Sequence, residues 1–349
     1  MLPEVRLLKD REQWDSIVQT FPSASFLQSS AWADLKSKYG WTTKRFVIGD
    51  KDSIRGGVQV LVRTRRVSHL GPSMGIAYVP RGPLAPETVD ARALVHAIVE
   101  EARQAGSSFL RVEPTSEAHA RILVDEGFVS SSRFIQIPRT GVVELGHDPD
   151  ELLKSFKSKM RYNIRLAFRR GVVVDAQQNE DAFRDFYELT KTTASREQFA
   201  VHHPSYYREA CRCFGQDAGL FVARHNGSPL AAVIAVAYGH TAVYLYGASS
   251  NIKRNLMAPH AVQWAAMQWA QTRGCRFYDL WGMSDPEDSE DPMAGVHRFK
   301  LGFQPQLKRY PGAYDRSIQK IRGRILRSGV LEFRSAINRW RGRGTSLSV

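Results

Sequence analysis

The chain has 349 residues, a length that predicts two domains. Hydrophobic residues make up 43% and charged residues 24% of it, which excludes a largely disordered chain. Lys and Arg outnumber Asp and Glu by 49 to 35, and the net charge of +14 favours a polyanionic partner such as tRNA, a nucleotide-linked substrate or anionic lipid.

Targeting and membrane-spanning signals are weak in this sequence. The N-terminus has charges throughout and no apolar core of a signal peptide. The longest apolar stretch, residues 230–238, is about half as long as a bilayer crossing requires. Three cysteines without zinc-ligand spacing fit a reducing compartment. We therefore expect a cytoplasmic protein, with peripheral contact at the inner face of the membrane left open.

The first half of the chain predicts a hairpin, a further strand, a helix and a closing strand. The strands are expected at residues 45–49, 57–62, 76–79 and 108–112, and the helix at residues 90–105.

A basic segment, residues 154–170, follows with seven Lys or Arg and no acidic residue. Phe156, Met160 and Ile164 recur every four residues, which predicts one helix with an apolar stripe and the charges on its other faces. Such a helix is either a solvated surface helix or a face that contacts an anion.

The second half repeats the same order of elements. Strands are expected at residues 220–224, 230–238, 242–248 and 276–281, a helix at 259–273, and a hairpin turn at Asn226-Gly227. The closing units match in detail, because Ala102-x-x-x-Gly106-x-x-Phe109 recurs 168 residues later as Ala270-x-x-x-Gly274-x-x-Phe277. The sequence therefore predicts a duplicated α/β domain.

The C-terminal segment 315–344 carries nine basic and two acidic residues, and its apolar residues fall at helical spacing. Together with the segment 154–170 it accounts for the whole net charge. We expect a basic amphipathic tail that packs on the body, contacts tRNA phosphates or lies on an anionic membrane.

Each half is similar to the core of the GNAT acyltransferase fold. That family binds the acyl-CoA pyrophosphate on a glycine-rich turn before the central helix, where backbone N–H groups meet phosphate. The corresponding stretch here, residues 250–259, contains no glycine. An ordinary CoA-dependent acetyltransferase is therefore disfavoured.

More specific motifs run through nearly the whole chain before the tail. They are Gln28-Ser29-x-x-Trp32-x-x-x-Lys36, Pro80-Arg81-Gly82-Pro83, Tyr244-Leu245-Tyr246-Gly247-Ala248-Ser249-Ser250, Asn255-Leu256-Met257-Ala258-Pro259, Gln263-Trp264, Tyr278-Asp279-Leu280-Trp281-Gly282 and Phe299-Lys300-x-x-Phe303. This set closely resembles the FemABX family, the non-ribosomal peptidyltransferases that build peptidoglycan cross-bridges from aminoacyl-tRNA.

The resemblance implies an α/β fold of two tandem GNAT-like domains with mixed sheets. It implies the compact form without a coiled-coil arm, because no two adjoining long heptad-like helices are evident. The expected boundaries are residues 1–148 for the first domain and 149–314 for the second. Residues 315–349 form the basic tail, whose start is expected to pack on the first domain.

The reaction that the resemblance implies is ester aminolysis. An amino acid passes from aminoacyl-tRNA to the side-chain amine of a peptidoglycan precursor, either UDP-linked or lipid-linked. We expect no metal and no cofactor beyond tRNA as a co-substrate, and a monomeric protein.

Two residues are candidates for catalysis by this resemblance. Lys300 matches the family's essential lysine, which can stabilise the oxyanion or position the terminal tRNA nucleotide. Glu113, where relatives often have Asp before Pro, can accept the proton of the nucleophile or serve as a structural cap.

Candidate binding residues in the first half are Lys36, Trp32 and Arg81. Lys36 lies one helical turn after Trp32, and the resemblance implies that it contacts the phosphates of the precursor. Arg81 either approaches the anions of the precursor or braces its own turn. Phe299, beside Lys300, is a further candidate.

The second half adds Arg196, which matches an arginine beside the substrate cleft. Where many relatives carry a second arginine, this chain has histidines, so His203 is the candidate for a pH-dependent phosphate contact. Tyr206 and Tyr207 follow where the family places a tyrosine that contacts the precursor. Tyr246 is a further binding candidate, although it and Tyr244 can instead both pack in the core, with only one ring reaching the cleft. Tyr244 is expected to share a strand face with Tyr246.

Two other functions remain open from the sequence. One keeps the fold and uses another acyl donor, such as acyl-CoA or a carrier protein. The other is a non-catalytic RNA-binding or membrane-binding relative. The acidic stretch 285–291 is expected to be a surface loop rather than a metal site.

Overall fold

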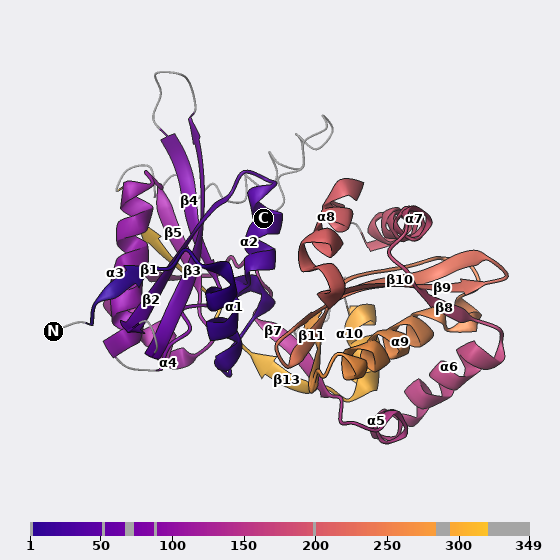
Figure 1. Ribbon diagram of the computed structural model, residues 1–349. Helices are drawn as coiled ribbons and strands as arrows, with labels where there is room; N and C mark the ends of the chain where they lie inside the picture. Colours follow the sequence, from indigo (N-terminus) through magenta and orange to yellow (C-terminus); the bar gives the residue numbers. More distant parts are fainter. Residues whose placement is uncertain are drawn as a thin grey trace. The chain divides into compact units, whose positions relative to one another are not determined.

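The computed structural model describes residues 3–50, 53–66, 73–86, 89–197, 200–283 and 294–319. The chain divides into two compact units, and the boundary follows Pro138 rather than residue 148. Of the described residues, the first unit contains those up to Pro138 and Tyr310 to Gln319, and the second contains those between Arg139 and Arg309 (Figure 1). The difference arises because β7 (Arg139–Glu144) pairs with strands of the second sheet.

The first unit is built on a seven-stranded mixed sheet. Its order is β1-β2-β3-β4-β5-β14-β6. The strands are β1 (Val5–Leu7), β2 (Thr42–Asp50), β3 (Ser53–Arg66), β4 (Ser73–Pro80), β5 (Phe109–Glu113), β14 (Ala313–Ser317) and β6 (Val129–Ser131), and the helices are α1 (Arg11–Thr20), α2 (Ser30–Ser37), α3 (Val89–Gln104) and α4 (Glu117–Asp125).

The hydrophobic core of this unit lies between α3 and the central strands. Leu94, Ile98 and Ala102 recur at helical spacing on α3 and are fully buried. They pack against alternate residues of the strands, such as Val58, Val60 and Val112. Alternation in the strands and the helical repeat in α3 therefore build one interface.

The last strand of this sheet comes from the C-terminal end of the described chain. β14 lies between β5 and β6 and is antiparallel to both. The stretch expected to begin a helical tail at Asp315 is therefore a strand at its start, and the rest of that tail lies outside the described residues. Arg111 on β5 donates from Nε and Nη2 to the two carboxylate oxygens of Asp315, both at 2.7 Å. Both side chains are buried.

The second unit also has a seven-stranded mixed sheet, in the order β13-β7-β12-β11-β10-β9-β8. Its strands after β7 are β8 (Val173–Ala176), β9 (Ala218–His225), β10 (Ser228–Tyr238), β11 (Thr241–Ser249), β12 (Phe277–Gly282) and β13 (Gln306–Arg309), and its helices are α5 (Pro149–Ser155), α6 (Ser158–Arg169), α7 (Glu180–Glu197), α8 (Pro204–Phe214), α9 (Ala258–Thr272) and α10 (Ala294–Lys300).

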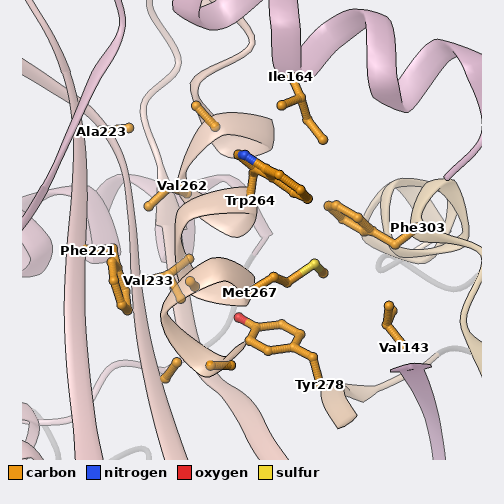
Figure 2. Packing of buried hydrophobic residues seen from close by; sticks show 14 of the residues in the cluster. Val143, Ile164, Phe221, Ala223, Val233, Val262, Trp264, Met267, Tyr278 and Phe303 are labelled. Carbon is orange, nitrogen blue, oxygen red and sulfur yellow. The ribbon is translucent and has the colours of Figure 1, made fainter. Parts of the chain in front are cut away.

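Helices cover both faces of this sheet, with α7 and α8 on one face and α6 and α9 on the other (Figure 1). This explains why residues 230–237 of β10 are buried without alternation. Figure 2 shows the core on the α9 side, where Trp264 lies near Ile164 of α6 and Phe303.

The basic segment 154–170 is not one helix. α5 ends at Ser155, Phe156 is its cap, and α6 starts at Ser158. The expected apolar stripe is nevertheless buried in the core, because Phe156, Met160 and Ile164 are at most 4% exposed. Its cations are left on the outer side.

The elements expected in each half are confirmed. In both sheets an antiparallel hairpin leads to a strand that runs parallel to the one after the helix, with β4 beside β5 and β11 beside β12. The longest helix in the described ranges is α7 with 18 residues, and none of those ranges forms a coiled-coil arm. Within the same ranges, no helix is long and apolar enough to cross a bilayer.

We predict that Asp315→Ala lowers the free energy of unfolding by about 3–5 kcal/mol, because it leaves the Arg111 guanidinium buried without its carboxylate. Glu151→Ala, which removes an exposed pair with Lys154, is the control and should change it by less than about 0.5 kcal/mol. Denaturant unfolding measures both, and equal values for the two variants would contradict the prediction.

Candidate functional site

The two parallel strand pairs differ at their C-terminal ends. β4 and β5 stay paired over five residues, up to Pro80 and Glu113. β11 and β12 pair only from Thr241 to Val243, opposite Phe277 to Asp279. Their later residues are unpaired with each other, so the second sheet parts at this point.

A β-bulge in β11 lies at the point of parting. Tyr244 is opposite Ala235 and Tyr246 is opposite Ile234, so Leu245 is an extra residue. The two tyrosines therefore lie on opposite faces of the sheet, and the expectation that they share a face is wrong. Tyr244 packs against the α9 core, whereas Tyr246 contacts Tyr207 of α8.

Space for the Tyr244 ring depends on Gly247. A Cβ built on Gly247 would collide with the hydroxyl and ring of Tyr244. The sequence Tyr-Leu-Tyr-Gly in β11 thus combines a bulge with the small residue that the displaced ring requires.

β12 is also irregular where it leaves β11. Trp281 has φ of 61°, a left-handed conformation that is costly for a bulky residue. Its backbone N–H donates to Oδ1 of Asp279 at 2.7 Å, and the Thr140 hydroxyl donates to the same oxygen. Asp279 therefore holds the turn that carries Gly282.

Lys300, at the end of α10, reaches this turn. Its Nζ donates to the carbonyl oxygen of Gly282 at 2.7 Å and lies 5.5 Å from the ring centre of Tyr244. The residue is only 6% exposed. Burial lowers the pKa of Lys300 to about 8, while the Asp279 carboxylate acts to raise it. The site thus holds an ammonium group that loses its proton in a neutral to mildly alkaline range.

Phe299 points to the core rather than to the Lys300 amine. Its ring makes edge contacts with His260, at 5.1 Å between ring centres, and Phe303, at 5.4 Å. It fixes α10 on α9, and its contact with a substrate stays a prediction.

Tyr206 and Tyr246 come together on the other face of the sheet, 6.3 Å apart. His202 stacks on Tyr206 at 4.2 Å. Tyr206 is buried, and burial beside Tyr206 raises the pKa of Tyr246 well above its usual value. Both rings lie in this aromatic cluster, and their contact with the precursor stays a prediction.

Arg196 and His203 mark the ends of helices on this same face. Arg196, on α7, donates to Oδ1 of Asn251 at 2.5 Å and to the carbonyl oxygen and hydroxyl of Ser249. It also pairs with Glu197. His203 caps α8 through the backbone N–H of Ser205. The Arg196 contacts position the end of β11, and phosphate binding by either residue stays a prediction.

In the first unit, Lys36 and Trp32 form a pair on α2. Nζ of Lys36 lies 4.2 Å from the centre of the Trp32 ring, a cation–π contact. Lys36 is 1% exposed. Burial, and to a smaller extent the positive charge of Arg63, lowers its pKa to about 7. An anion bound beside this amine would favour its charged form.

Glu113 is the last residue of β5, and its carboxylate is hydrogen-bonded by other groups of the protein. Its carboxylate accepts from the Tyr78 hydroxyl at 2.6 Å and from the backbone N–H groups of Ile135 and Gln136. Burial raises the pKa of Glu113, against the effect of these bonds. These contacts fit the role of a structural cap, one of the two roles expected for Glu113 from the sequence. A role in proton transfer stays a prediction.

Arg81 braces the chain where it leaves and re-enters the first unit. Its guanidinium lies 3.6 Å from the centre of the Tyr310 ring and donates to the carbonyl oxygen of Ile137 at 2.9 Å. The Tyr310 N–H donates to the carbonyl oxygen of Pro138. Of the two roles expected for Arg81, these contacts fit bracing rather than an approach to the anions of the precursor.

Sequence reasoning assigned no role to Asp279, Thr140 or Gln263, although two of them lie in quoted motifs. Asp279 is a buried carboxylate in the apolar run Tyr-Asp-Leu-Trp, and this is the signal that could have identified it. Gln263 is a buried amide on α9 that accepts from the Tyr278 hydroxyl at 3.0 Å. Thr140 gave no signal, because its partner lies 139 residues away.

The chain is similar to known proteins in sequence and in fold. The FemAB family model matches residues 10–137, 127–228 and 224–327. The Lipid II:glycine glycyltransferase of Staphylococcus epidermidis is 24% identical over 383 aligned residues, which cover 87% of this chain and 90% of that protein.

Two solved structures share the fold. A crystal structure of FemX has a TM-score of 0.82 and 21% identity, covering 93% of this chain and 100% of its own. A tandem GNAT protein from the clavulanic acid biosynthesis pathway has a TM-score of 0.54 and 15% identity, covering 90% and 99%. The fold is therefore that of two tandem GNAT-like domains.

We predict that Asp279→Asn lowers the midpoint of the Lys300 titration below about pH 8, because the variant removes the carboxylate that favours the charged amine. NMR titration of isotope-labelled lysine measures this midpoint. Asp175→Asn, which alters a carboxylate paired with Arg224, is the control and should leave it unchanged. An unchanged midpoint in Asp279→Asn would refute the link.

Proposed function

The chain belongs to the FemAB family, and we propose that it transfers an amino acid from aminoacyl-tRNA to a side-chain amine of a peptidoglycan precursor. The family match over three overlapping segments supports this assignment of reaction class. The staphylococcal relative is named for transfer of glycine to lipid II, which favours a lipid-linked acceptor over a UDP-linked one.

The observation that carries the proposal is the buried amine of Lys300 at the parting of β11 and β12. Ester aminolysis joins the acceptor nitrogen to the ester carbonyl carbon and then breaks the bond from that carbon to the ribose oxygen. The nitrogen loses one proton and the departing ribose oxygen gains one, so the step balances. Negative charge develops on the carbonyl oxygen in between.

Lys300 is suited to stabilise that oxygen. A lysine ammonium has three N–H donors, and the Gly282 carbonyl takes one, which also orients the amine. Low exposure strengthens the interaction with a developing oxyanion, because water screens it little. In this proposal Lys300 acts as an electrostatic donor and Lys36 binds acceptor phosphate.

The acyl-CoA alternative gains little support from the turn before α9. In a GNAT site this turn offers backbone N–H groups to a pyrophosphate. Here Lys253 and Met257 adopt left-handed conformations without being glycine, and Pro259 lacks an N–H. An aminoacyl ester donor does not require that phosphate cradle.

The deciding experiment offers the purified protein a mixed pool of charged tRNAs with labelled amino acids. UDP-linked and lipid-linked muropeptides serve as separate acceptors, and acyl-CoA is tested as a parallel donor. Transfer from tRNA to either acceptor supports the proposal and identifies the amino acid. Transfer from acyl-CoA alone would replace it with the alternative.

We predict that Lys300→Met lowers kcat about 10²–10³-fold, the usual loss when one oxyanion donor is removed. The variant should remain folded, because methionine fills the same buried space without a charge. Thermal unfolding checks the fold, and steady-state transfer measures kcat. Wild-type kcat in a folded Lys300→Met protein would remove Lys300 from the mechanism.

For Lys36→Met we expect a raised KM for the acceptor with a smaller change in kcat, since its proposed role is binding. Lys38→Met, at the exposed end of the same helix, is the matched control and should leave KM unchanged. Equal KM values for the two variants would contradict the role of Lys36.

The pH dependence follows from the same amine. The fraction of protonated Lys300 falls as pH rises through about 8, so a rate that requires the ammonium form falls there. Ionisation of the acceptor amine changes wild type and variant alike, and it cancels in the ratio of Asp279→Asn to wild-type rates. That ratio should decrease between neutral pH and pH 8, because the variant loses its proton earlier. A ratio independent of pH would refute this reading.

A further inference from the structure

One end of the second sheet gathers three segments that the proposed reaction does not use. They are the C-terminal turn of α6, the start of β8 and the loop 250–257 before α9. We call these segments the basic rim. They carry exposed apolar side chains between cations.

Strand register and two contacts bring the rim together. Val173 at the start of β8 pairs with Arg224, and the next hairpin turn leads to β10, whose Leu230 carbonyl accepts from the Ser250 N–H. Arg170 donates to the carbonyl oxygen of Asn255 at 2.7 Å. Figure 1 shows the chain passing from α6 to β8 at this end of the sheet (Figure 1).

The apolar side chains of the rim are among the most exposed in the described chain. Ile252 is 62% exposed, Val173 is 61% and Phe168 is 43%. They come from three separate segments. Other apolar residues of these segments, such as Ala167, Val172 and Leu256, are buried in the core. Exposed apolar residues gathered in this way mark an interaction site.

The charge of the rim has one sign. The C-terminal part of α6 with the start of β8, residues 165–174, and the loop 250–257 hold five Lys or Arg and no acidic residue. The carboxylates of Asp175 and Asp185, which follow on β8 and α7, both pair with Arg224. Along α6, Arg165 and Arg169 lie on the same surface as Tyr162 and Phe168. The partner is therefore anionic.

We propose that the basic rim docks the protein on an anionic phospholipid bilayer. Ile252, Val173 and Phe168 would enter the interface between headgroups and acyl chains, while the neighbouring arginines and lysines contact lipid phosphates. RNA fits less well, because the two most exposed side chains are β-branched aliphatics without a face for base stacking. Long basic side chains can keep their charge at the headgroups while the apolar tips insert.

This docking goes beyond the transfer reaction and does not depend on it. It needs neither the Lys300 site nor any donor or acceptor. Vesicle binding therefore tests it separately, and failure of the transfer assay would leave it standing.

The experiment measures co-sedimentation of the full chain with vesicles of phosphatidylglycerol and phosphatidylcholine, and with phosphatidylcholine alone. Ile252→Ser and Lys253→Gln should each weaken binding to the anionic vesicles about fivefold, the loss expected for one interfacial apolar side chain or one basic contact. Binding to phosphatidylcholine alone should be weaker for every protein.

Each variant has a matched control in the first unit. Val124→Ser removes an apolar side chain that is 54% exposed, and Lys9→Gln removes an exposed cation with the same change in net charge. Both should bind the vesicles as wild type does, and thermal unfolding confirms that all four variants are folded. The full chain keeps its C-terminal basic segment in every case, so a difference between variant and control reports the rim.

Two outcomes would overturn the proposal. In the first, Ile252→Ser and Lys253→Gln bind anionic vesicles like their controls. In the second, a gel shift with tRNA shows a loss for Lys253→Gln while vesicle binding is unchanged, which assigns the rim to RNA.

Discussion

The ion pair between Arg111 and Asp315 joins parts of the chain that are 204 residues apart in sequence. Because β14 lies inside the first sheet rather than at its edge, β6 pairs with the sheet through a strand that follows the entire second unit. A guanidinium and a carboxylate at this depth are stable only as a pair, since burying either alone is costly. The first sheet is therefore complete only when the chain returns from the second unit. Arg81 contacts Ile137 and Tyr310, which lie next to the points where the chain leaves and re-enters the first unit.

The duplicated fold becomes a site in the second unit through two local irregularities. In the first unit β4 and β5 stay paired to their ends. The carboxylate of Glu113 at that end accepts hydrogen bonds from donors within the protein. In the second unit the β11 bulge and the left-handed Trp281 separate the strands. Strain of this kind persists where surrounding contacts enforce it, and Asp279 supplies them. The separation of the two strands is therefore held by contacts within the protein.

Periodicity in the sequence predicted the strands, the helices and their duplicated order, because each element buries one face or one stripe. It could not predict the faces of Tyr244 and Tyr246, since one extra residue in a strand reverses every later side chain and leaves no mark in composition. The break between Phe156 and Lys157 was missed for a similar reason, because Phe156 before it and Met160 and Ile164 after it enter one core. Lys36 and Lys300 were found through motifs, but their burial came from tertiary contacts that no local pattern records.

The positive charge of this chain is of two kinds that respond differently to a ligand. The guanidinium groups of the basic rim are charged at every physiological pH, so they attract anions over distance and are weakened by salt. Lys36 and Lys300 are instead buried, and the loss of hydration disfavours their charged forms. Their lowered pKa values, about 7 and about 8, bring both amines close to losing a proton at neutral pH. An anion arriving at such an amine raises its pKa, so the charge strengthens when the ligand is in place. This coupling gives a buried lysine selectivity for a bound phosphate or a developing oxyanion that an exposed arginine lacks, even though both contribute equally to the net charge.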